Sequence, residues 1–250
     1  MKYSHVISLG FFCGVALEIE RQGLRDGSYP FDWCISKDWM GLEKAIMTNY
    51  KDFLSYECMS QSISDPNNYK NEYNVQFFHD FTKFNTLKEQ LPDIKSKYRR
   101  RIDKFYTNIK EPTLFIRYIN DDNGKDEIEY WNNNSQHLEN FLKTYNSNNK
   151  IVFIANSELA NNYRNIEVYY AEKEEHSTIA KQPLILNRSI QKLFEQIEYD
   201  EEQKNRNIIF YKSKMKQKAI SEARNRRFMR RVVNKIYDFL KPIKYHNKTY

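Results

Sequence analysis

The chain has 250 residues, enough for one sizeable core or for one core with an appendage. It carries 40 Lys and Arg, 33 Asp and Glu and three cysteines, and its formal net charge is +7. No apolar run approaches the roughly 18 residues of a membrane-spanning helix. Three cysteines without CxxC spacing exclude a disulfide framework and a zinc ribbon, and they predict a reducing, cytoplasmic location. No phosphate-binding glycine loop and no metal-ligand spacing is present, so no cofactor and no metal is predicted.

The positive charge is concentrated at the end of the chain. From Lys212 to Tyr250 there are thirteen Lys and Arg and two acidic residues, a balance of +11. The other 211 residues hold 27 basic and 31 acidic side chains, a balance of −4. We therefore predict a single α/β domain over residues 1–211, which carries the functional site, and a basic amphipathic helix or tail over residues 212–250.

The first elements surround a cysteine. Residues 5–10 (HVISLG) predict a short strand, and residues 14–22 predict a helix closed by Gly23. Cys13 then lies at the first turn of that helix, over unpaired backbone N–H groups, where the helix dipole favours a thiolate. This spacing suits a cysteine nucleophile. The alternative is a small buried residue at a strand–helix junction, which is a common use of free cysteine.

The next segments alternate in type. A second helix is expected over residues 36–50 with Ser36 as its N-cap, and residues 60–73 are polar and predict a loop. Residues 73–81 predict a half-buried strand with His79 on the same face as Val75, Phe77 and Phe81.

A long helix should follow Thr86, with Pro92 starting its main part. Strands are expected at residues 113–119, 150–156, 166–170 and 207–211, and helices at residues 135–145, 157–163 and 189–197, while residues 120–134 predict a polar connection.

This alternation predicts βαβ units and a three-layer α/β fold, with a mainly parallel central sheet and helices on both faces. The active site of such a fold lies beyond the carboxyl ends of the strands, here residues 10–13, 117–122 and 156–158. A papain-like α+β fold, in which the helix of Cys13 packs against an antiparallel barrel, is the alternative.

Residues 8–33 also carry a resemblance. The matching pieces are Ser8-Leu9-Gly10, Cys13, Val15-Ala16, Gly23-Leu24-Arg25 and Tyr29-Pro30-Phe31-Asp32-Trp33, with weaker matches at residues 78–81 and 114–117. Together they cover about the first half of the chain. They resemble a bacterial family of papain-like cysteine peptidases, otherwise a domain of unknown function.

The resemblance implies a thiol-dependent hydrolase or acyl-transfer enzyme that acts on an amide or ester. Cys13 would be its nucleophile, His79 its base and Asp32 the carboxylate that orients the base. The structural alternatives are a buried core histidine for His79 and a helix or turn cap for Asp32. His137 fits the papain interval of roughly 130 to 150 residues better than His79 does, but it lies in an expected amphipathic helix.

Four further residues are candidate substrate-binding residues. Backbone N–H groups near Gly10 and Gly14 could approach an oxyanion, which acyl transfer requires. Arg117 ends an apolar strand and either pairs with Asp121 or Asp122 or binds a substrate carboxylate or phosphate. Asp80 falls on the face of its predicted strand opposite to His79.

The basic tail is amphipathic. Met229, Val232, Val233, Ile236 and Leu240 fall on one helical stripe, and five basic residues occupy the other face: Arg226, Arg227, Arg230, Arg231 and Lys235. A helix of this kind binds an anionic membrane surface, which would make the protein peripheral at the inner face of the membrane, or packs on its own domain. Nucleic acid is disfavoured by the acidic remainder of the chain.

A second class of function stays open. The same cleft in a noncatalytic binding protein, or in a glycosyl- or phosphoryl-transfer protein with Arg117 as its anion clamp, would serve bacterial surface-polysaccharide assembly. The sequence therefore leaves peptide, ester and glycan substrates as alternatives, and it does not predict an oligomeric state.

Overall fold

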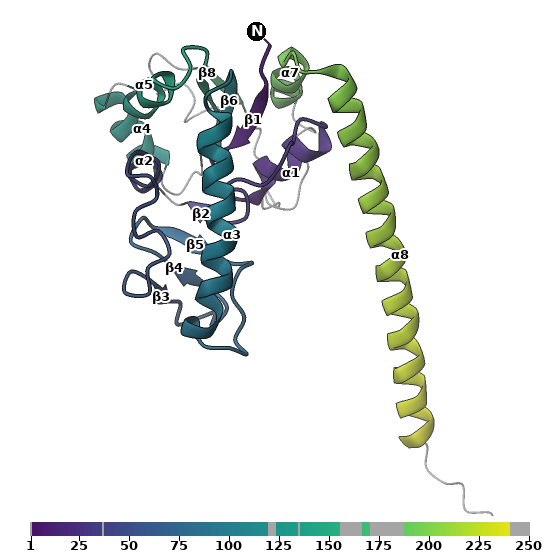
Figure 1. Ribbon diagram of the computed structural model, residues 1–250. Helices are drawn as coiled ribbons and strands as arrows, with labels where there is room; N and C mark the ends of the chain where they lie inside the picture. The colour runs from purple at the N-terminus through teal and green to yellow at the C-terminus, as the bar shows by residue number, and fades with distance from the viewer. Residues whose placement is uncertain are drawn as a thin grey trace, which may run out of the picture. The chain divides into compact units, whose positions relative to one another are not determined.

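The computed structural model describes residues 2–36, 38–119, 124–134, 136–155, 167–170 and 188–240. The chain divides into two compact units, residues 1–208 and residues 209–250 (Figure 1). The first unit contains both sheets and most of the helices. The second consists of the greater part of one long helix and the residues that follow it.

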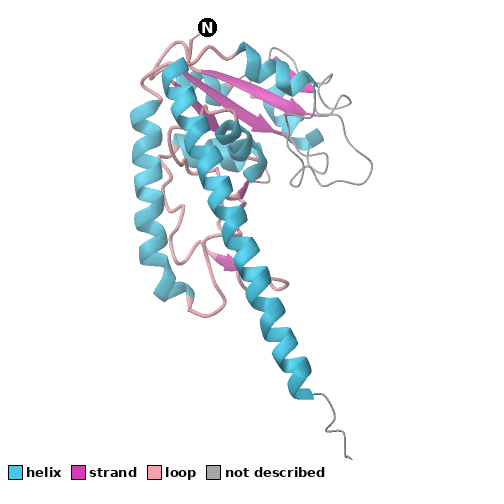
Figure 2. Ribbon diagram, turned by 90° about the vertical axis from the view of Figure 1, so that its right-hand side faces the viewer, coloured by secondary structure: helices cyan, strands magenta, loops and turns pink. Residues whose placement is uncertain are grey.

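A parallel sheet forms the centre of the first unit (Figure 2). Its strands are β1 (His5–Ser8), β6 (Thr113–Tyr118), β7 (Lys150–Ala155) and β8 (Glu167–Tyr170), in the order β1-β6-β7-β8. All three neighbouring pairs are parallel. The strands are rich in β-branched and aromatic residues, and all six residues of β6 are buried. The predicted parallel sheet is confirmed.

Helices cover both faces of this sheet because alternate strand residues point to opposite sides. Leu114, Ile116 and Tyr118 pack on one side with α1 (Cys13–Arg21) and α7 (Arg188–Gln196). Phe115 and Phe153 pack on the other side with four helices: α2 (Trp39–Met47), α3 (Leu87–Asn108), α4 (Gly124–Asn133) and α5 (His137–Lys143). The predicted three-layer α/β architecture is therefore confirmed.

A second, antiparallel sheet was not predicted. Its strands are very short, in the order β2-β5-β4-β3: β2 (Ile35–Ser36), β3 (Ser60–Gln61), β4 (Tyr69–Lys70) and β5 (Val75–Phe77). A strand of two residues is too short to show the alternation of apolar and polar residues that predicts strands. Two of these strands, β3 and β4, therefore lie in the segment 60–73 that was predicted to be a loop. The predicted strand over residues 73–81 ends at Phe77. Phe81 is buried as expected, but His79 is exposed, so its predicted place on the buried face is wrong.

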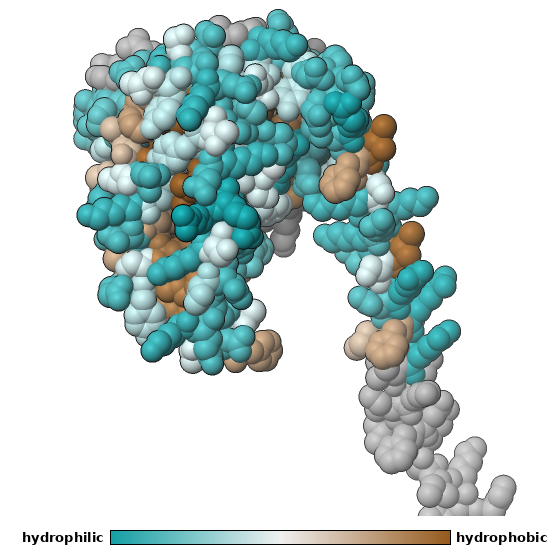
Figure 3. All heavy atoms as spheres, viewed as in Figure 1, coloured by the Kyte–Doolittle hydropathy of each residue, from teal (hydrophilic) through white to brown (hydrophobic). Residues whose placement is uncertain are grey.

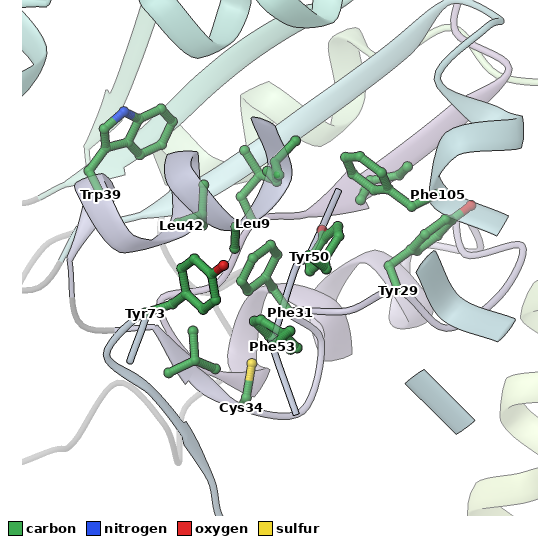
Figure 4. Close-up of a cluster of buried hydrophobic side chains, with 14 of the residues drawn as sticks. Leu9, Tyr29, Phe31, Cys34, Trp39, Leu42, Tyr50, Phe53, Tyr73 and Phe105 are labelled. Carbon is green, nitrogen blue, oxygen red and sulfur yellow. The ribbon is translucent and has the colours of Figure 1, made fainter. Parts of the chain in front are cut away.

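An aromatic cluster joins this small sheet to the segment around Asp32 (Figure 4). The ring of Phe53 lies 6.1 Å from Phe31, 5.2 Å from Tyr50 and 5.7 Å from Phe77 between centroids. These side chains are at most 5% exposed. Aromatic pairs at such separations stabilise a core beyond the area that they bury. The cluster therefore packs the loop before Asp32 against the strand before His79.

Helix boundaries follow local capping. The side chain of Asp38, not the predicted Ser36, caps α2 by accepting from the N–H of Gly41. Thr86 and Glu89 form a reciprocal capping box at the start of α3, and Pro92 lies inside that helix. The predicted helix at residues 157–163 lies outside the described residues.

Two predictions of element type are wrong. The polar segment expected to be a connection forms α4, whose buried residues Ile128 and Trp131 lie one turn apart. The predicted strand at residues 207–211 is part of α8 (Glu201–Leu240). None of the described helices is long and apolar enough to span a bilayer.

Candidate functional site

Cys13 is the first residue of α1, directly after the turn that leaves the carboxyl end of β1. Phe12 occupies the N-cap position with extended backbone (φ −144°), and no side chain caps the helix. Among the described residues, the N–H groups of the first turn therefore have no side-chain acceptor, and they carry the positive end of the helix dipole. Cys13 is half-buried and packs against the apolar cluster that contains Phe12 and Tyr118.

The thiol is not activated by its surroundings alone. Burial raises the pKa of Cys13, and the contact with its own backbone amide offsets only part of that increase. The thiol form consequently predominates at neutral pH, and a nucleophilic role requires a base that removes the proton.

The turn after β1 requires glycine at position 10, because a side chain there would not fit. Its φ is +85°, and a Cβ atom built there would lie 2.4 Å from the Ser36 hydroxyl oxygen. Its N–H donates to the Ser8 hydroxyl at 3.1 Å, so this N–H is already paired. Gly14, in the first turn of α1, would place a Cβ 2.2 Å from the Phe12 ring. Of the two glycines, the N–H of Gly14 is the one without a side-chain acceptor in the described part of the chain.

Arg117 is buried in the sheet and fully paired. Its Nε and Nη2 donate to the two carboxylate oxygens of Glu127 at 2.8 and 3.0 Å. Nη1 donates to the Leu9 carbonyl at 3.0 Å and to the Ser36 hydroxyl at 2.6 Å, and Nη2 also donates to the Ser36 carbonyl at 3.1 Å. These bonds use all five guanidinium donors, so none remains for a substrate anion.

The partner of Arg117 was not foreseen. Asp121 and Asp122 lie outside the described residues, and the observed carboxylate is Glu127 in α4. Both side chains of the pair are at most 1% exposed. Burial raises the pKa of Glu127, and the Arg117 charge and hydrogen bonds act against that increase. A buried arginine requires such a partner, so the apolar strand around Arg117 signals a buried carboxylate beside it without identifying which one.

Asp32 is also held in a structural contact. Its Oδ2 accepts from Arg25 at 2.7 Å and from the N–H of Tyr29 at 2.8 Å. The Arg25 guanidinium lies over the Trp33 ring at 4.9 Å. Burial raises the pKa of Asp32 to about 6, although Arg25 and the Tyr29 N–H favour the charged form. These contacts close the loop that connects α1 to β2.

Asp80 and His79 have different surroundings. The Asp80 carboxylate, 2% exposed, accepts from Lys97 and from the Tyr98 hydroxyl of α3. His79 is exposed, lies in the bend that follows β5, and has no hydrogen bond with a described residue. In the part of the chain that the structure describes, no hydrogen bond joins His79 to Cys13 or to Asp32. The structure instead brings Gly10 and Arg117 together around Ser36.

Two other histidines bind carboxylates, which sequence reasoning did not predict. The Nδ1 of His137 lies 2.9 Å from an oxygen of Glu43, a buried carboxylate that also accepts from Trp39 and Tyr130. His137 itself is 57% exposed. The Nδ1 of His5 lies 2.7 Å from Asp26, but His5 begins β1 and so lies at the end of that strand opposite to Cys13.

Two surface grooves lie along α3. One, of about 380 Å³, is lined by residues that include Tyr50, Arg99 and Ile102. The other, of about 430 Å³, is lined by Tyr56, Leu91 and their neighbours. Neither groove is lined by Cys13 or His79. Residues 120–123, 156–166 and 171–187, which follow β6, β7 and β8 in the sequence, lie outside the described residues.

Comparison with known proteins supports the resemblance in the first half of the chain. A family model described as "Putative papain-like cysteine peptidase (DUF1796)" matches residues 4–158. "Uncharacterized protein R408" of Acanthamoeba polyphaga mimivirus is 33% identical over 120 residues, which cover 40% of this chain and 54% of that protein. The chain thus spans about half the length of this curated relative. No solved structure matches.

The comparisons confirm the predicted family and leave the finer predictions as they were. The relative is viral and its name assigns no activity, so bacterial origin and a role in surface-polysaccharide assembly remain predictions. The matched residues 4–158 include Cys13, Asp32, His79 and Arg117, and they end just after β7.

Proposed function

Because the family match covers more than half of the chain, the chain belongs to the family described as "Putative papain-like cysteine peptidase", and we propose that it is a cysteine-nucleophile enzyme acting on an amide or ester. The observation that carries the proposal is the position of Cys13. A half-buried thiol stands at the uncapped N-terminus of α1, at the carboxyl edge of a parallel sheet. Ligands of α/β proteins bind at that edge.

The proposed reaction has two steps. In the first, a base takes the Cys13 proton, the sulfur forms a bond with the substrate carbonyl carbon, and the amine or alcohol leaves with a proton from that base. In the second, water attacks the thioester carbon, giving a carboxylic acid and the free thiol. In an acyl transfer, an amine or alcohol replaces the water. First-turn N–H groups of α1, including that of Gly14, would stabilise the oxyanion.

We assign the base to His79. Among the described histidines, it is the exposed one that no described carboxylate binds, and it follows a strand that the aromatic cluster packs against the Asp32 loop. Catalytic hydrogen bonds are often long before substrate binds, so the lack of a hydrogen bond between His79 and Cys13 in the described residues is compatible with His79 as the base. The occupied donors of Arg117 favour acyl chemistry over phosphoryl transfer clamped by that residue.

The proposal is tested by hydrolysis assays on the full chain with a set of coumarin amides and nitrophenyl esters. Cys13→Ala should abolish turnover of every substrate that the wild type cleaves, whereas Cys58→Ala should leave it unchanged. His79→Ala should lower kcat by at least about a hundredfold, the usual contribution of a positioned general base.

His137→Ala is the matched control for the base. His137 is exposed like His79 but binds Glu43, and we expect its loss to change kcat little. Loss of activity in His137→Ala with full activity in His79→Ala would contradict the assignment of the base. Full activity in Cys13→Ala would overturn the proposed function.

A further inference from the structure

The second unit presents apolar side chains to solvent. Every residue of α8 from Lys212 to Met229 is exposed. Among them, Ile220 is 45% exposed, Phe228 65% and Met229 56%. Figure 3 shows brown apolar side chains interspersed with teal polar ones along this helix. Exposure of large apolar groups costs free energy in water, so a surface that concentrates them indicates an interaction site.

The same segment is strongly basic. Between residues 212 and 231 there are nine lysine and arginine residues and one acidic residue, Glu222, which gives a net charge of +8. Residues 1–208 hold 27 basic and 31 acidic residues, a balance of −4. The attraction of this protein for an anionic partner is therefore confined to the second unit.

The two properties combine toward the end of the helix. The backbone of α8 continues to Leu240, and at 100° per residue the sequence places positions 229, 232, 233, 236 and 240 on one stripe. Arg227 and Arg231 fall on the opposite face, whereas Arg226 lies beside the stripe. A helix with an apolar stripe and a face of arginine lies in the plane of a membrane interface with its apolar side inserted.

We propose that the second unit binds the surface of an anionic phospholipid bilayer through residues 212–240 of α8. The arginines and lysines attract the charged headgroups, and the apolar stripe inserts below them. Nucleic acid shares the charge complementarity, but its binding would leave the apolar stripe in water. The bilayer is the anionic partner that accepts both faces of the helix. This inference is independent of the chemistry proposed for Cys13.

The test is co-sedimentation of the full chain with vesicles of phosphatidylcholine alone and of phosphatidylcholine with about one-third phosphatidylserine, a typical anionic surface. We expect binding to the anionic vesicles and little binding to the neutral ones. Binding should weaken as ionic strength rises from about 0.01 M to about 1 M, because the Debye length falls from about 30 Å to about 3 Å.

Two pairs of substitutions separate the contributions of the faces. Arg227→Glu with Arg231→Glu should weaken vesicle binding by about thirtyfold or more, the equivalent of losing two interfacial charges. Met215→Asn with Met229→Asn should weaken it more than about tenfold, because these two exposed apolar side chains, four turns apart on the same stripe, no longer insert. Circular dichroism should show unchanged helix content in both.

The matched control is Arg99→Glu with Arg100→Glu on α3, an equal change of charge at exposed positions of the first unit. We expect binding within about threefold of wild type, because the proposal places the membrane contact in the second unit alone.

Several outcomes would overturn the proposal. One is no pelleting with anionic vesicles at low salt. Another is vesicle binding that survives the Met215 and Met229 changes while a DNA fragment binds equally well. A third is a concentration-dependent dimer in sedimentation that the Met215 and Met229 changes dissociate, with no lipid effect, which would make the stripe a contact between copies of this chain.

Discussion

Arg117 is the residue whose replacement should cost most, because its charge has no access to water. Arg117→Ala would leave the Glu127 carboxylate buried without its partner, and we expect a loss of about 3–5 kcal/mol in the free energy of unfolding. Arg117→Lys should also destabilise, since an ammonium cannot replace the five-donor fork. Urea denaturation followed by circular dichroism measures both.

A double substitution provides the control. Arg117→Met with Glu127→Leu removes both charges, and its cost should be smaller than the sum of the single changes. If Arg117→Ala were as stable as wild type, the buried pair would not stabilise the contact between the sheet and α4. Binding a ligand would then again be the alternative role for Arg117.

At this scale the sequence predicted the position of Cys13 and the need of Arg117 for an anion. It could not identify Glu127, because a carboxylate in a stretch rich in Asn and Asp carries no sign of burial. It placed His79 on the wrong face by extending a two-residue period past Phe77, where the chain bends. The carboxylate beside His137 was missed for a similar reason. Glu43 lies 94 positions earlier, and only the packing of α2 against α5 brings the two together.

Among the elements, the loop between α1 and β2 makes stability depend on pH through Asp32. Burial raises the pKa of Asp32 from 3.8 to about 6 despite the Arg25 charge. A carboxyl whose pKa is higher in the folded protein stabilises it below the unfolded value, and that stability is lost as pH rises through about 6. The shift corresponds to on the order of 2–3 kcal/mol between about pH 4 and pH 7.

The prediction is checked by urea denaturation of wild type and Asp32→Asn at several values between pH 4 and pH 7. The decline of the unfolding free energy over this window should be shallower in Asp32→Asn. The exposed Asp93→Asn should reproduce the wild-type slope. Equal slopes for all three proteins would contradict the assignment of the raised pKa to Asp32.

The elements that sequence predicted correctly are those with a strong local signal. β6 and β7 are mainly apolar, β-branched and aromatic runs, and α3 begins at a capping box. The missed elements lack that signal. Asn and Asp obscure α4, where only Ile128 and Trp131 mark the buried face. Residues 207–211 (NIIFY) contain two isoleucines and two aromatic residues, which favour a strand, but the charged, helix-favouring residues on both sides continue α8 through them.

For the whole molecule, alternation of strands and helices was enough to predict the three-layer architecture. That alternation could not predict the antiparallel sheet, since strands of two or three residues are defined by their partners and not by their own sequence.

The two proposed functions belong to different parts of the chain. The family match ends at residue 158, before the helix that we assign to the membrane surface, so the two functions are tested separately.

The central claim is that Cys13 is a nucleophile, and acylation by an activated ester tests it most directly. The full chain is mixed with a nitrophenyl ester, quenched in acid within one turnover, and mapped by peptide mass spectrometry. We predict one acyl group per chain, on Cys13, with Cys58 unmodified although it is also half-buried, and acylation slowed in His79→Ala. Acyl groups found on Cys58 or on lysines as often as on Cys13, or an unchanged rate in Cys13→Ala, would contradict the claim.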